Sequence, residues 1–305
     1  MSATFPFAVA RTRSELASEL NKLRELGQTV ALVPTMGSLH DGHLSLIDWA
    51  RSVCDETVVS IFVNRLQFSV GEDFDVYPRD LERDLERAAA RGARLVFAPS
   101  EAVIYPAGEP RVHVDPGDMG SKLCGGFRPG HFRGVLTVVA KLLGLVRPDV
   151  AVFGRKDFQQ CVLMRNMAED LDQGVRIEIA PLVRETEGLA ISSRNLYLSR
   201  QEREDALGIS RGLFEAERLF RGGERRVTLL LNAIGAVVAA HPGLCLQYVA
   251  CVNPDTLDLV EHADAGSVVA IAAFSGRTRL IDNVVLGDDA SDRFADGSTI
   301  DESRG

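Results

Sequence analysis

The stretch from residue 30 to residue 44 constrains the fold more than any other part of this chain. An apolar run from Val30 to Val33 indicates a buried strand that stops at Pro34. A turn of small residues follows, and a helical pattern begins near Asp41. The apolar stripe of this helix consists of Leu44, Ile47 and Ala50. A strand, a tight turn and a helix in this order are typical of sites that hold nucleotide phosphates.

Two histidines lie at this turn. His40 and His43 stand three positions apart, so they share one face if the helix has begun there. Gly42 lies between them and has no β-carbon, which lets a ligand approach the backbone closely. The first N–H groups of the helix add a partial positive charge. The pattern H-x-G-H therefore favours a polyphosphate ligand.

Two other interpretations of the histidines stay open. A histidine beside a turn is often a surface or core residue with its hydrogen bonds satisfied, and histidine pairs at this spacing also bind metal ions. No third metal ligand is evident nearby, because Asp41 would point to a different face of the helix. The motif alone thus indicates nucleotide binding without excluding the alternatives.

Composition narrows the classes of partner. A chain of 305 residues favours two domains, and its net charge of -9 argues against affinity for a nucleic-acid backbone. A local basic pocket for a small anion stays possible. The five cysteines are odd in number and never form a C-x-x-C pair, which fits a reducing compartment. No run approaches the ~18 apolar residues of a membrane span, so we expect a cytoplasmic protein without a membrane partner.

Polar residues follow three further apolar runs in the same way. The run 57–63 is followed by Asn64 and Gln67; Asn64 could equally be a turn former, whereas Gln67 is a poor one. The run 150–153 is followed by Gly154, Arg155, Lys156, Asp157 and, in the next helix, Gln160. A lone lysine is normally a surface residue. The position of Lys156 in a second strand-turn-helix junction makes that interpretation less favourable.

The last strand of this series, 176–180, precedes a loop that contains Ser192, Ser193 and Arg194. Ser199 already caps the following helix, so we expect the Ser-Ser-Arg set to be free for a ligand. Strands that alternate with helices predict a parallel α/β sheet, which binds ligands at the carboxyl ends of its strands. The four polar sets are all at such ends. The P-loop, dinucleotide and serine-hydrolase motifs are absent from the sequence.

The remaining chain predicts the domain organisation. The helix expected at 131–146 is apolar almost all round, which indicates burial in the core or against a second subunit. From residue 201 two helices precede β-rich segments. We predict a Rossmann-like domain at 1–188, a smaller C-terminal α+β domain at 189–287 and a disordered acidic tail at 288–305. Removal of that tail should leave activity intact.

Several motifs together resemble a known family. They are Pro34-Thr35-Met36-Gly37-x-Leu39-His40-x-Gly42-His43, Ile61-Phe62-Val63-Asn64, Gln67-Phe68, Tyr77-Pro78-Arg79, Gly134-Val135-Leu136-Thr137-Val138-Val139, Lys156-Asp157-x-Gln159-Gln160 and Ser192-Ser193-Arg194-Asn195. From about Leu16 to Asn283 the chain is similar to the pantoate–β-alanine ligases. The resemblance implies a Rossmann-like fold of the nucleotidylyltransferase superfamily, with ATP as substrate, Mg²⁺, and a cytoplasmic homodimer.

The resemblance also implies a reaction in two steps. The carboxylate of pantoate attacks the α-phosphorus of ATP to give pantoyl adenylate and pyrophosphate. The amine of β-alanine then attacks the activated carbonyl, which gives pantothenate and AMP. The loop from Ser69 to Val76 is expected to shelter the adenylate from water.

Site residues follow from the matching positions. The implied catalytic residues are His40, His43, Lys156 and Arg194, with His43 as the acid. The implied ATP-binding residues are Pro34, Thr35, Met36, Gly37, Ser38, Leu39, His40, Asp41, Gly42, His43, Gly154, Arg155, Lys156, Asp157, Val183, Ile191, Ser192, Ser193 and Arg194. Gln67 and Gln160 would bind pantoate, together with Asn64 and Met36. Asp84 is the one acidic residue that we name as support for Mg²⁺.

The chain departs from the commonest family pattern at Arg65, Arg155 and Ile191. We expect Arg155 to add positive charge beside the polyphosphate. Two other functions stay open: another adenylate-forming or nucleotidyl-transferring enzyme of the superfamily, or a non-catalytic ATP-binding module. The paired glutamines favour pantoate over a phosphorylated acceptor, because neutral amides orient a carboxylate without tight ion pairing.

Overall fold

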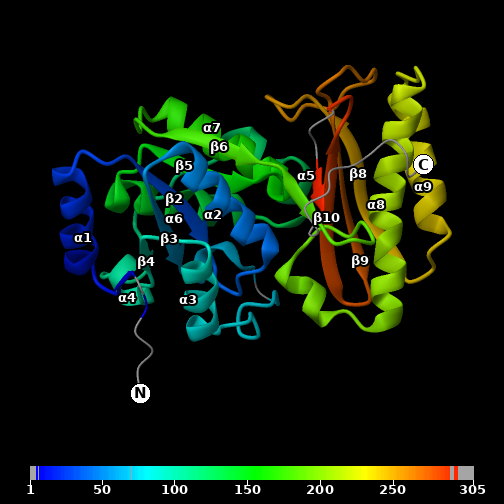
Figure 1. Ribbon diagram of the computed structural model, residues 1–305. Helices are drawn as coiled ribbons and strands as arrows, with labels where there is room; N and C mark the ends of the chain where they lie inside the picture. Colours follow the sequence, from blue (N-terminus) through cyan, green and yellow to red (C-terminus); the bar gives the residue numbers. More distant parts are fainter. Residues whose placement is uncertain (1–4, 6, 70, 289–291, 295–305) are drawn as a thin grey trace. The chain divides into compact units, whose positions relative to one another are not determined.

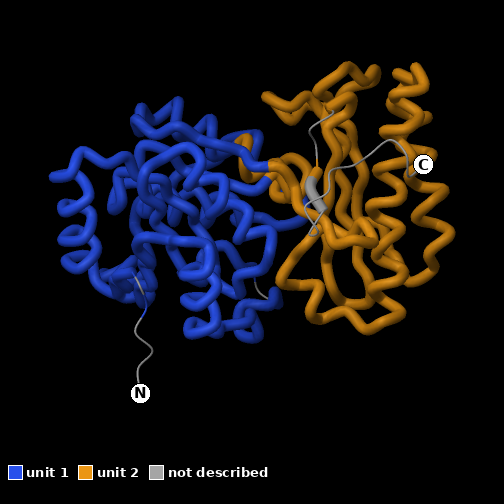
Figure 2. The backbone as a smooth tube through the Cα atoms, in the orientation of Figure 1, with its two compact units in different colours: residues 1–121, 125–154, 163–180 blue, residues 122–124, 155–162, 181–305 orange. Residues whose placement is uncertain are grey.

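The computed structural model describes residues 5, 7–69, 71–288 and 292–294. The chain divides into two compact units (Figure 2). Unit 1 comprises 1–121, 125–154 and 163–180, and unit 2 comprises 122–124, 155–162 and 181–305. The compact units divide after residue 180, and two short segments before that residue, 122–124 and 155–162, belong to unit 2. The domain boundary expected at residue 188 stays a prediction.

Unit 1 contains a six-stranded sheet in the order β1-β4-β3-β2-β5-β6, with all neighbouring strands parallel (Figure 1). The strands are β1 (Ala8–Ala10), β2 (Val30–Thr35), β3 (Glu56–Ile61), β4 (Leu95–Phe97), β5 (Val150–Gly154) and β6 (Arg176–Ala180). The α/β class predicted from the sequence is confirmed. β1 was not predicted, because three residues are too few to carry a period.

The helices of this part of the chain are α1 (Arg13–Glu25), α2 (Asp41–Val53), α3 (Leu81–Ala90), α4 (Glu101–Ile104), α5 (Leu123–Phe127), α6 (His131–Val146) and α7 (Phe158–Asp170). Short 3₁₀ turns are η1 (Arg65–Gln67), η2 (Gly117–Ser121) and η3 (Arg155–Asp157). A capping box between Thr12 and Glu15 begins α1. The predicted stripe of α2 is buried, so this amphipathic helix covers the sheet as expected.

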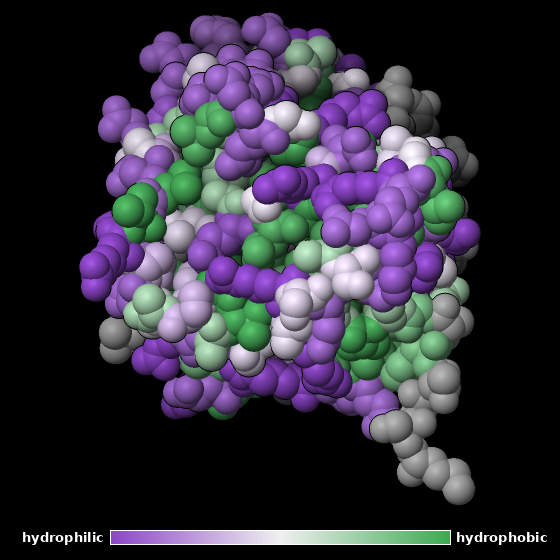
Figure 3. All heavy atoms as spheres, turned by 90° about the vertical axis from the view of Figure 1, so that its left-hand side faces the viewer, coloured by the Kyte–Doolittle hydropathy of each residue, from purple (hydrophilic) through white to green (hydrophobic). Residues whose placement is uncertain are grey.

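Burial explains why these segments fold as they do. Residues 30–33 of β2 are at most 2% exposed, since a parallel strand with helices on both faces has no wet side. α6 is buried within unit 1 over most of its length, which favours the core interpretation of its apolar sequence. The face in Figure 3 is largely hydrophilic, with hydrophobic residues in small separate areas.

The strand order reverses direction between β2 and β5. β3 and β4 follow β2 on one side, whereas β5 and β6 lie on the other, and Ala31 pairs with Val150 across the two central strands. Ligands of open α/β sheets bind outside the carboxyl ends of the strands at such a point. The chain turns after Thr35 and after Gly154 at this place, which is where two of the predicted site segments begin.

Unit 2 is built on a three-stranded antiparallel sheet, in the order β10-β9-β8. The strands are β8 (Leu244–Val252), β9 (Val268–Ser275) and β10 (Thr278–Val285), and the helices are α8 (Arg200–Arg221) and α9 (Val227–Ala239). One hydrophobic core joins these helices to the sheet through Leu213, Ile234 and Ile271. The 3₁₀ turn η4 (Ser193–Tyr197) precedes α8. The predicted smaller α+β region is confirmed.

The prediction that residues 288–305 are disordered is wrong for 292–294, which the structure describes as a paired strand. Asp292–Phe294 forms β11, which pairs in parallel with β7 (Leu182–Arg184), and Asp292 is buried. Low apolar content predicted disorder, but here the segment is held by charge rather than by apolar burial. Residues 289–291 and 295–305 lie outside the described residues. Among the residues that are described, no helix has both the length and the apolar character needed to cross a membrane.

Candidate active site

The turn after β2 places both histidines at the start of α2. His40 is the N-cap residue, and its backbone N–H donates to Nδ1 of His43 at 3.4 Å. The two rings stack with centroids 3.9 Å apart and an interplanar angle of 22°. Because Nδ1 of His43 accepts a hydrogen bond, the proton of the neutral ring resides on Nε2. His43 can therefore present a donor at the end of the helix where the dipole favours anions.

Asp84 holds the backbone of this turn. Its carboxylate accepts the N–H groups of Ser38 and Leu39 at 2.9 and 2.7 Å, and it is buried. Burial raises the pKa of Asp84, while these two N–H groups act in the opposite direction. Both carboxylate oxygens thus serve the turn, and the predicted metal role of Asp84 stays a prediction. Thr35 contributes to the same turn by accepting the N–H of Gly37 on its hydroxyl.

A buried polar network holds Gln67 at the end of β3. Asn64 donates to Oε1 of Gln67 at 3.1 Å and accepts the hydroxyl of Tyr105 at 2.8 Å. The amide nitrogen of Gln67 is 2.9 Å from Sδ of Met36. Nδ1 of His131 is 2.7 Å from the carbonyl of Gln67. Unit 1 therefore brings together Met36, Asn64 and Gln67, three of the residues predicted to bind substrate.

The loop after Gln67 is anchored at two places. Arg128 makes two hydrogen bonds with the carboxylate of Glu72, and the guanidinium of Arg79 donates to the carbonyl of Phe74. Arg65 and Arg79 each lie over the ring of Phe74, 5.5 and 5.2 Å from its centroid. The family departure at Arg65 thus gives this loop a cation–π contact.

In unit 2, the turn η3 carries the predicted phosphate-binding lysine. The side-chain amide of Asn283 donates to the carbonyls of Arg155 and Lys156 at 3.0 and 3.1 Å. Lys156 itself is half-buried, and its ammonium lies 3.9 Å from a carboxylate oxygen of Asp157. α7 begins directly after this turn and places Gln160 in its first turn.

The prediction for Arg155 needs correction. We expected its charge to lie beside the polyphosphate, but the side chain is 10% exposed and pairs with Asp288 and Asp292 at 3.0 and 2.7 Å. A guanidinium neutralised by two carboxylates offers little positive charge to a ligand. No local pattern indicated this pairing, because both partners lie in the segment for which we predicted disorder.

The segment from Val183 to Arg194 folds back on itself. Ile191 donates its N–H to the carbonyl of Val183, and Asn195 donates its amide to Glu185 and to the carbonyl of Ala190. Ser192 caps η4 by accepting the N–H of Arg194. The expectation that this set is free of structural duties is wrong for Ser192. Unit 2 thus brings Val183 next to Ile191 and places Ser193, which is buried, and Arg194 on the following turn.

Sequence reasoning missed four residues that support the site. Tyr105 and His131 hold the network around Gln67, while Asp282 and Asn283 support the two segments of unit 2. His131 stands three positions before the family motif that begins at Gly134, and Asn283 stands where the family resemblance ends. Tyr105 and Asp282 carried no signal, since a buried tyrosine or aspartate is recognised only when its partner is known.

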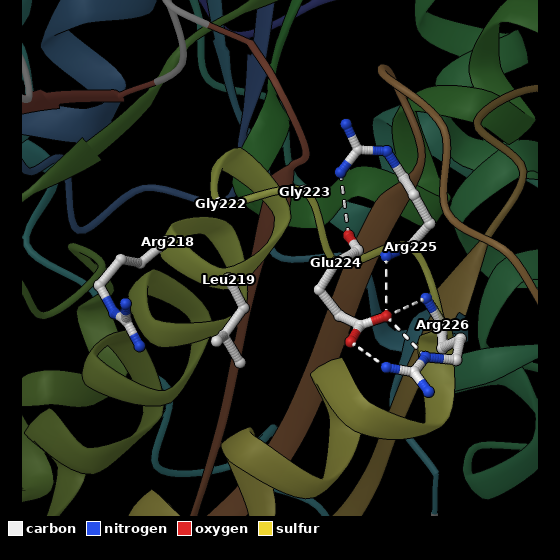
Figure 4. A pocket seen from close by; sticks show the side chains of 7 residues that line it. All are labelled: Arg218, Leu219, Gly222, Gly223, Glu224, Arg225 and Arg226. Atoms are coloured by element: carbon white, nitrogen blue, oxygen red, sulfur yellow. Dashed lines mark hydrogen bonds and ion pairs between the residues drawn. The ribbon is translucent and has the colours of Figure 1, made fainter.

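A cavity of about 670 Å³ lies at the connection of α8 and α9 (Figure 4). Its lining consists of Arg218, Leu219, Gly222, Gly223, Glu224, Arg225 and Arg226. Arg226 is paired with Glu224, Arg218 with Glu215, and Arg225 donates to the carbonyl of Phe220. None of the predicted site residues lines this cavity, and its cations already have partners. We assign it no ligand.

A parallel sheet with an H-x-G-H turn at its switch point defines a nucleotide-binding α/β protein. The family profile described as pantoate-beta-alanine ligase matches residues 8–285. The pantothenate synthetase of Thermoanaerobacter sp. (strain X514) is 48% identical over 275 residues, which cover 90% of this chain and 97% of that protein. The chain belongs to the pantoate–β-alanine ligase family, and it is a ligase that joins pantoate to β-alanine.

Solved structures agree with this assignment. A crystal structure of pantothenate synthetase from Thermus thermophilus has a TM-score of 0.86 and 41% identity, over 92% of this chain and 99% of that chain. The pantoate-beta-alanine ligase from Francisella tularensis, complexed with beta-gamma ATP and beta-alanine, has a TM-score of 0.75 and 34% identity. It covers 92% of this chain and 97% of its own.

Proposed function

We propose that this chain makes pantothenate through a pantoyl adenylate, using the residues predicted at its two strand-turn-helix junctions. A carboxylate oxygen of pantoate forms a bond to the α-phosphorus as the bond to pyrophosphate breaks. The β-alanine nitrogen then bonds to the pantoyl carbonyl carbon, and AMP leaves. The stacked His40 and His43 at the β2–β5 switch point are the observation that carries this proposal.

The roles divide between the two junctions. His40 and His43 contact the phosphates, and Nε2 of His43 donates a hydrogen bond to the developing charge. Lys156 and Arg194 neutralise the polyphosphate, with Ser192 and Ser193 beside them. Val183 and Ile191 line the nucleotide. Gln67 and Gln160 orient pantoate, and the network of Asn64 fixes Gln67 before substrate arrives.

We propose that Mg²⁺ enters with ATP. Among the described residues no group of three acidic, histidine or cysteine side chains could hold a metal ion. Mg²⁺ usually keeps several waters and binds substrate phosphates with one or two carboxylates, so a protein cage is not required. Asp84, the acidic residue predicted to support the ion, does not fit this role well, because it is buried and both of its carboxylate oxygens accept backbone N–H groups of the turn. When bound, the ion would neutralise charge on the phosphates.

A homodimer and a cytoplasmic location complete the proposal. The five cysteines are all free, which fits a reducing compartment. Analytical ultracentrifugation of the purified full chain tests the dimer, and sedimentation as a monomer at micromolar concentration would refute it.

Pyrophosphate release tests the function. We expect release from ATP and Mg²⁺ only when pantoate is present, and multiple turnovers of AMP only when β-alanine is added. His43→Ala and Lys156→Ala should each lower the rate by about 100-fold or more, because each removes a group that stabilises transferring charge. Lys22→Ala is the matched control, since Lys22 is exposed and pairs with Glu19 on the surface of α1.

The outcomes separate the alternatives. Pyrophosphate release with a different carboxylic acid, and none with pantoate, would indicate another adenylating enzyme. ATP binding without pyrophosphate release would indicate a binding module. Equal activity of Lys156→Ala and Lys22→Ala would remove Lys156 from the proposed site.

A further inference from the structure

A buried ion-pair network connects the C-terminal segment to the two ATP-binding segments of unit 2. Its members are Arg155, Arg184, Asp282, Asp288 and Asp292. The side chains of Arg184, Asp282 and Asp292 are at most 2% exposed. Buried charges of this kind need complete pairing, since an unpaired one is strongly destabilising.

Asp292 is the member that both arginines share. Its Oδ1 accepts Nη2 of Arg155 at 2.7 Å, and its Oδ2 accepts Nε of Arg184 at 2.5 Å. Arg184 also makes two hydrogen bonds with Asp282, and its guanidinium carbon lies 4.9 Å from the centre of the Phe214 ring. The carboxylate of Asp292 therefore joins the turn at residue 155 to the strand that ends at residue 184.

Each arginine is adjacent to a residue proposed to contact ATP. Arg155 precedes Lys156 in η3, and Arg184 follows Val183 in β7. The backbone of the segment 292–294 pairs with β7 along its whole length. A shift of Asp292 would therefore disturb the Lys156 turn through one carboxylate oxygen and the Val183 strand through the other.

The segment lies outside the family match, which ends at residue 285. Asp288 and Asp292 are thus carboxylates that the family profile does not cover, whereas Arg155 lies within it. Without them, two cationic side chains would remain beside one buried carboxylate. The pairing accounts for an arginine directly before the phosphate-binding lysine, a place where its charge would otherwise be unopposed.

We propose that Asp292 is a positioning residue for ATP, which holds the Lys156 turn and the Val183 strand in register through Arg155 and Arg184. The C-terminal segment then contributes to ATP binding by holding the two segments of unit 2 that are proposed to contact ATP. This replaces the expectation that the tail can be removed without effect. It rests on the proposed contacts of Lys156 and Val183 with ATP.

The test compares four versions of the full enzyme: wild type, Asp292→Asn, Lys156→Ala and a chain that ends at residue 294. Asp292→Asn keeps the shape but removes the charge that both arginines need. We measure the affinity for ATP by equilibrium titration, the KM values for ATP and pantoate by pyrophosphate release, and the thermal unfolding midpoint. The chain ending at 294 keeps the paired segment and is the matched control.

We expect Asp292→Asn to raise the Kd and KM for ATP by about 10-fold, since small misplacements of binding groups have effects of this order or larger. Its KM for pantoate should rise less than its KM for ATP, because Gln67, one of the two residues proposed to orient pantoate, is held in unit 1, whereas Gln160 follows the Lys156 turn. The chain ending at 294 should match the wild type. A lower unfolding midpoint with unchanged ATP affinity would mean a purely structural role and would overturn the proposal.

A second variant guards against failure to fold. Arg155→Gln combined with Asp292→Asn removes one charge of each sign and leaves the Arg184–Asp282 pair balanced. If Asp292 acts on the turn through Arg155, this double variant should bind ATP no more weakly than either single variant. If the losses of ATP affinity in the two single variants add up in the double variant, Asp292 does not act on the turn through Arg155.

The controls separate this proposal from the proposed function. Weaker ATP binding by Lys156→Ala but not by Asp292→Asn refutes the positioning role and leaves the ligase site standing. Unchanged ATP binding by Lys156→Ala removes Lys156 from the proposed ATP site, and the positioning role that depends on the Lys156 turn falls with it.

Discussion

The two strand-turn-helix junctions of this protein look alike in sequence but are held by opposite chemistry. The turn after β2 points backbone N–H groups at its anchor, and the anchor is an acceptor, the carboxylate of Asp84. The turn after β5 points carbonyl groups at its anchor, and the anchor is a donor, the amide of Asn283. Each anchor supplies the partner that the exposed backbone groups lack.

The anchors also differ in their distance along the chain. Asp84 lies 45 positions from Leu39, whereas Asn283 lies 128 positions from Arg155, although each pair belongs to a single unit. The second junction depends further on ion pairs with residues at the end of the described chain. The turn after β2 can therefore form together with the sheet of unit 1. The turn after β5 also needs the C-terminal region in place.

Glycine substitutions should produce the largest contrast between the junctions. Gly37 has φ +81°, and a Cβ there would lie 2.8 Å from a carboxylate oxygen of Asp84. Gly37→Ala should cost about 2–4 kcal/mol, from the left-handed backbone and the clash together. Gly154→Ala places its Cβ 3.7 Å from Leu46, an ordinary contact, and should change stability by less than about 1 kcal/mol. Urea unfolding measures both; equal losses would break the comparison.

Removal of the acceptor at the first junction should have an intermediate effect. Asp84→Asn keeps one oxygen but replaces the other with a donor that faces a backbone N–H. We expect a loss of about 1–3 kcal/mol in unfolding free energy. Asp48→Asn is the control, because its pair with Arg91 is exposed and should contribute less than about 1 kcal/mol. If the two variants are equally stable, Asp84 does not hold the turn.

Acidification should cause the smallest loss of stability among these tests. It acts on the Glu72–Arg128 pair, which anchors the loop after Gln67. Burial acts to raise the pKa of Glu72, but the hydrogen bonds and charge of Arg128 outweigh it and keep the pKa below the ordinary value of 4.5. The pair therefore stabilises the fold fully above pH 4.5 and loses its contribution as pH falls through the lowered pKa.

Comparison with Glu72→Gln tests this effect. The variant should be less stable than the wild type near pH 7, by about 1 kcal/mol or less, and the difference should shrink as pH falls below about 4. Thermal unfolding across pH measures the difference. A gap that stays constant down to about pH 3 would show that Glu72 does not titrate as this pair requires.

Local patterns accounted for the fold class and for much of the candidate site. The strand, turn and helix around His40 were predictable because apolar periodicity and turn residues act within a few positions. The carboxyl-end placement of Asn64 and Gln67 followed from the same rule. The duties of Asp84, Tyr105 and Asn283 could not be predicted in this way, since each depends on a partner far along the chain.

The C-terminal segment shows most clearly what the sequence alone could not predict. Its acidic sequence with few apolar residues predicted disorder, because composition indicates only how much apolar surface a segment can bury. Asp292 is nevertheless buried, since Arg155 and Arg184 offer it a paired and desolvated place. By itself, the sequence determined the parallel α/β fold, the family and the residue types at the strand ends. The tertiary structure alone decided which buried charges meet, because ion pairing depends on distances that only the folded chain sets.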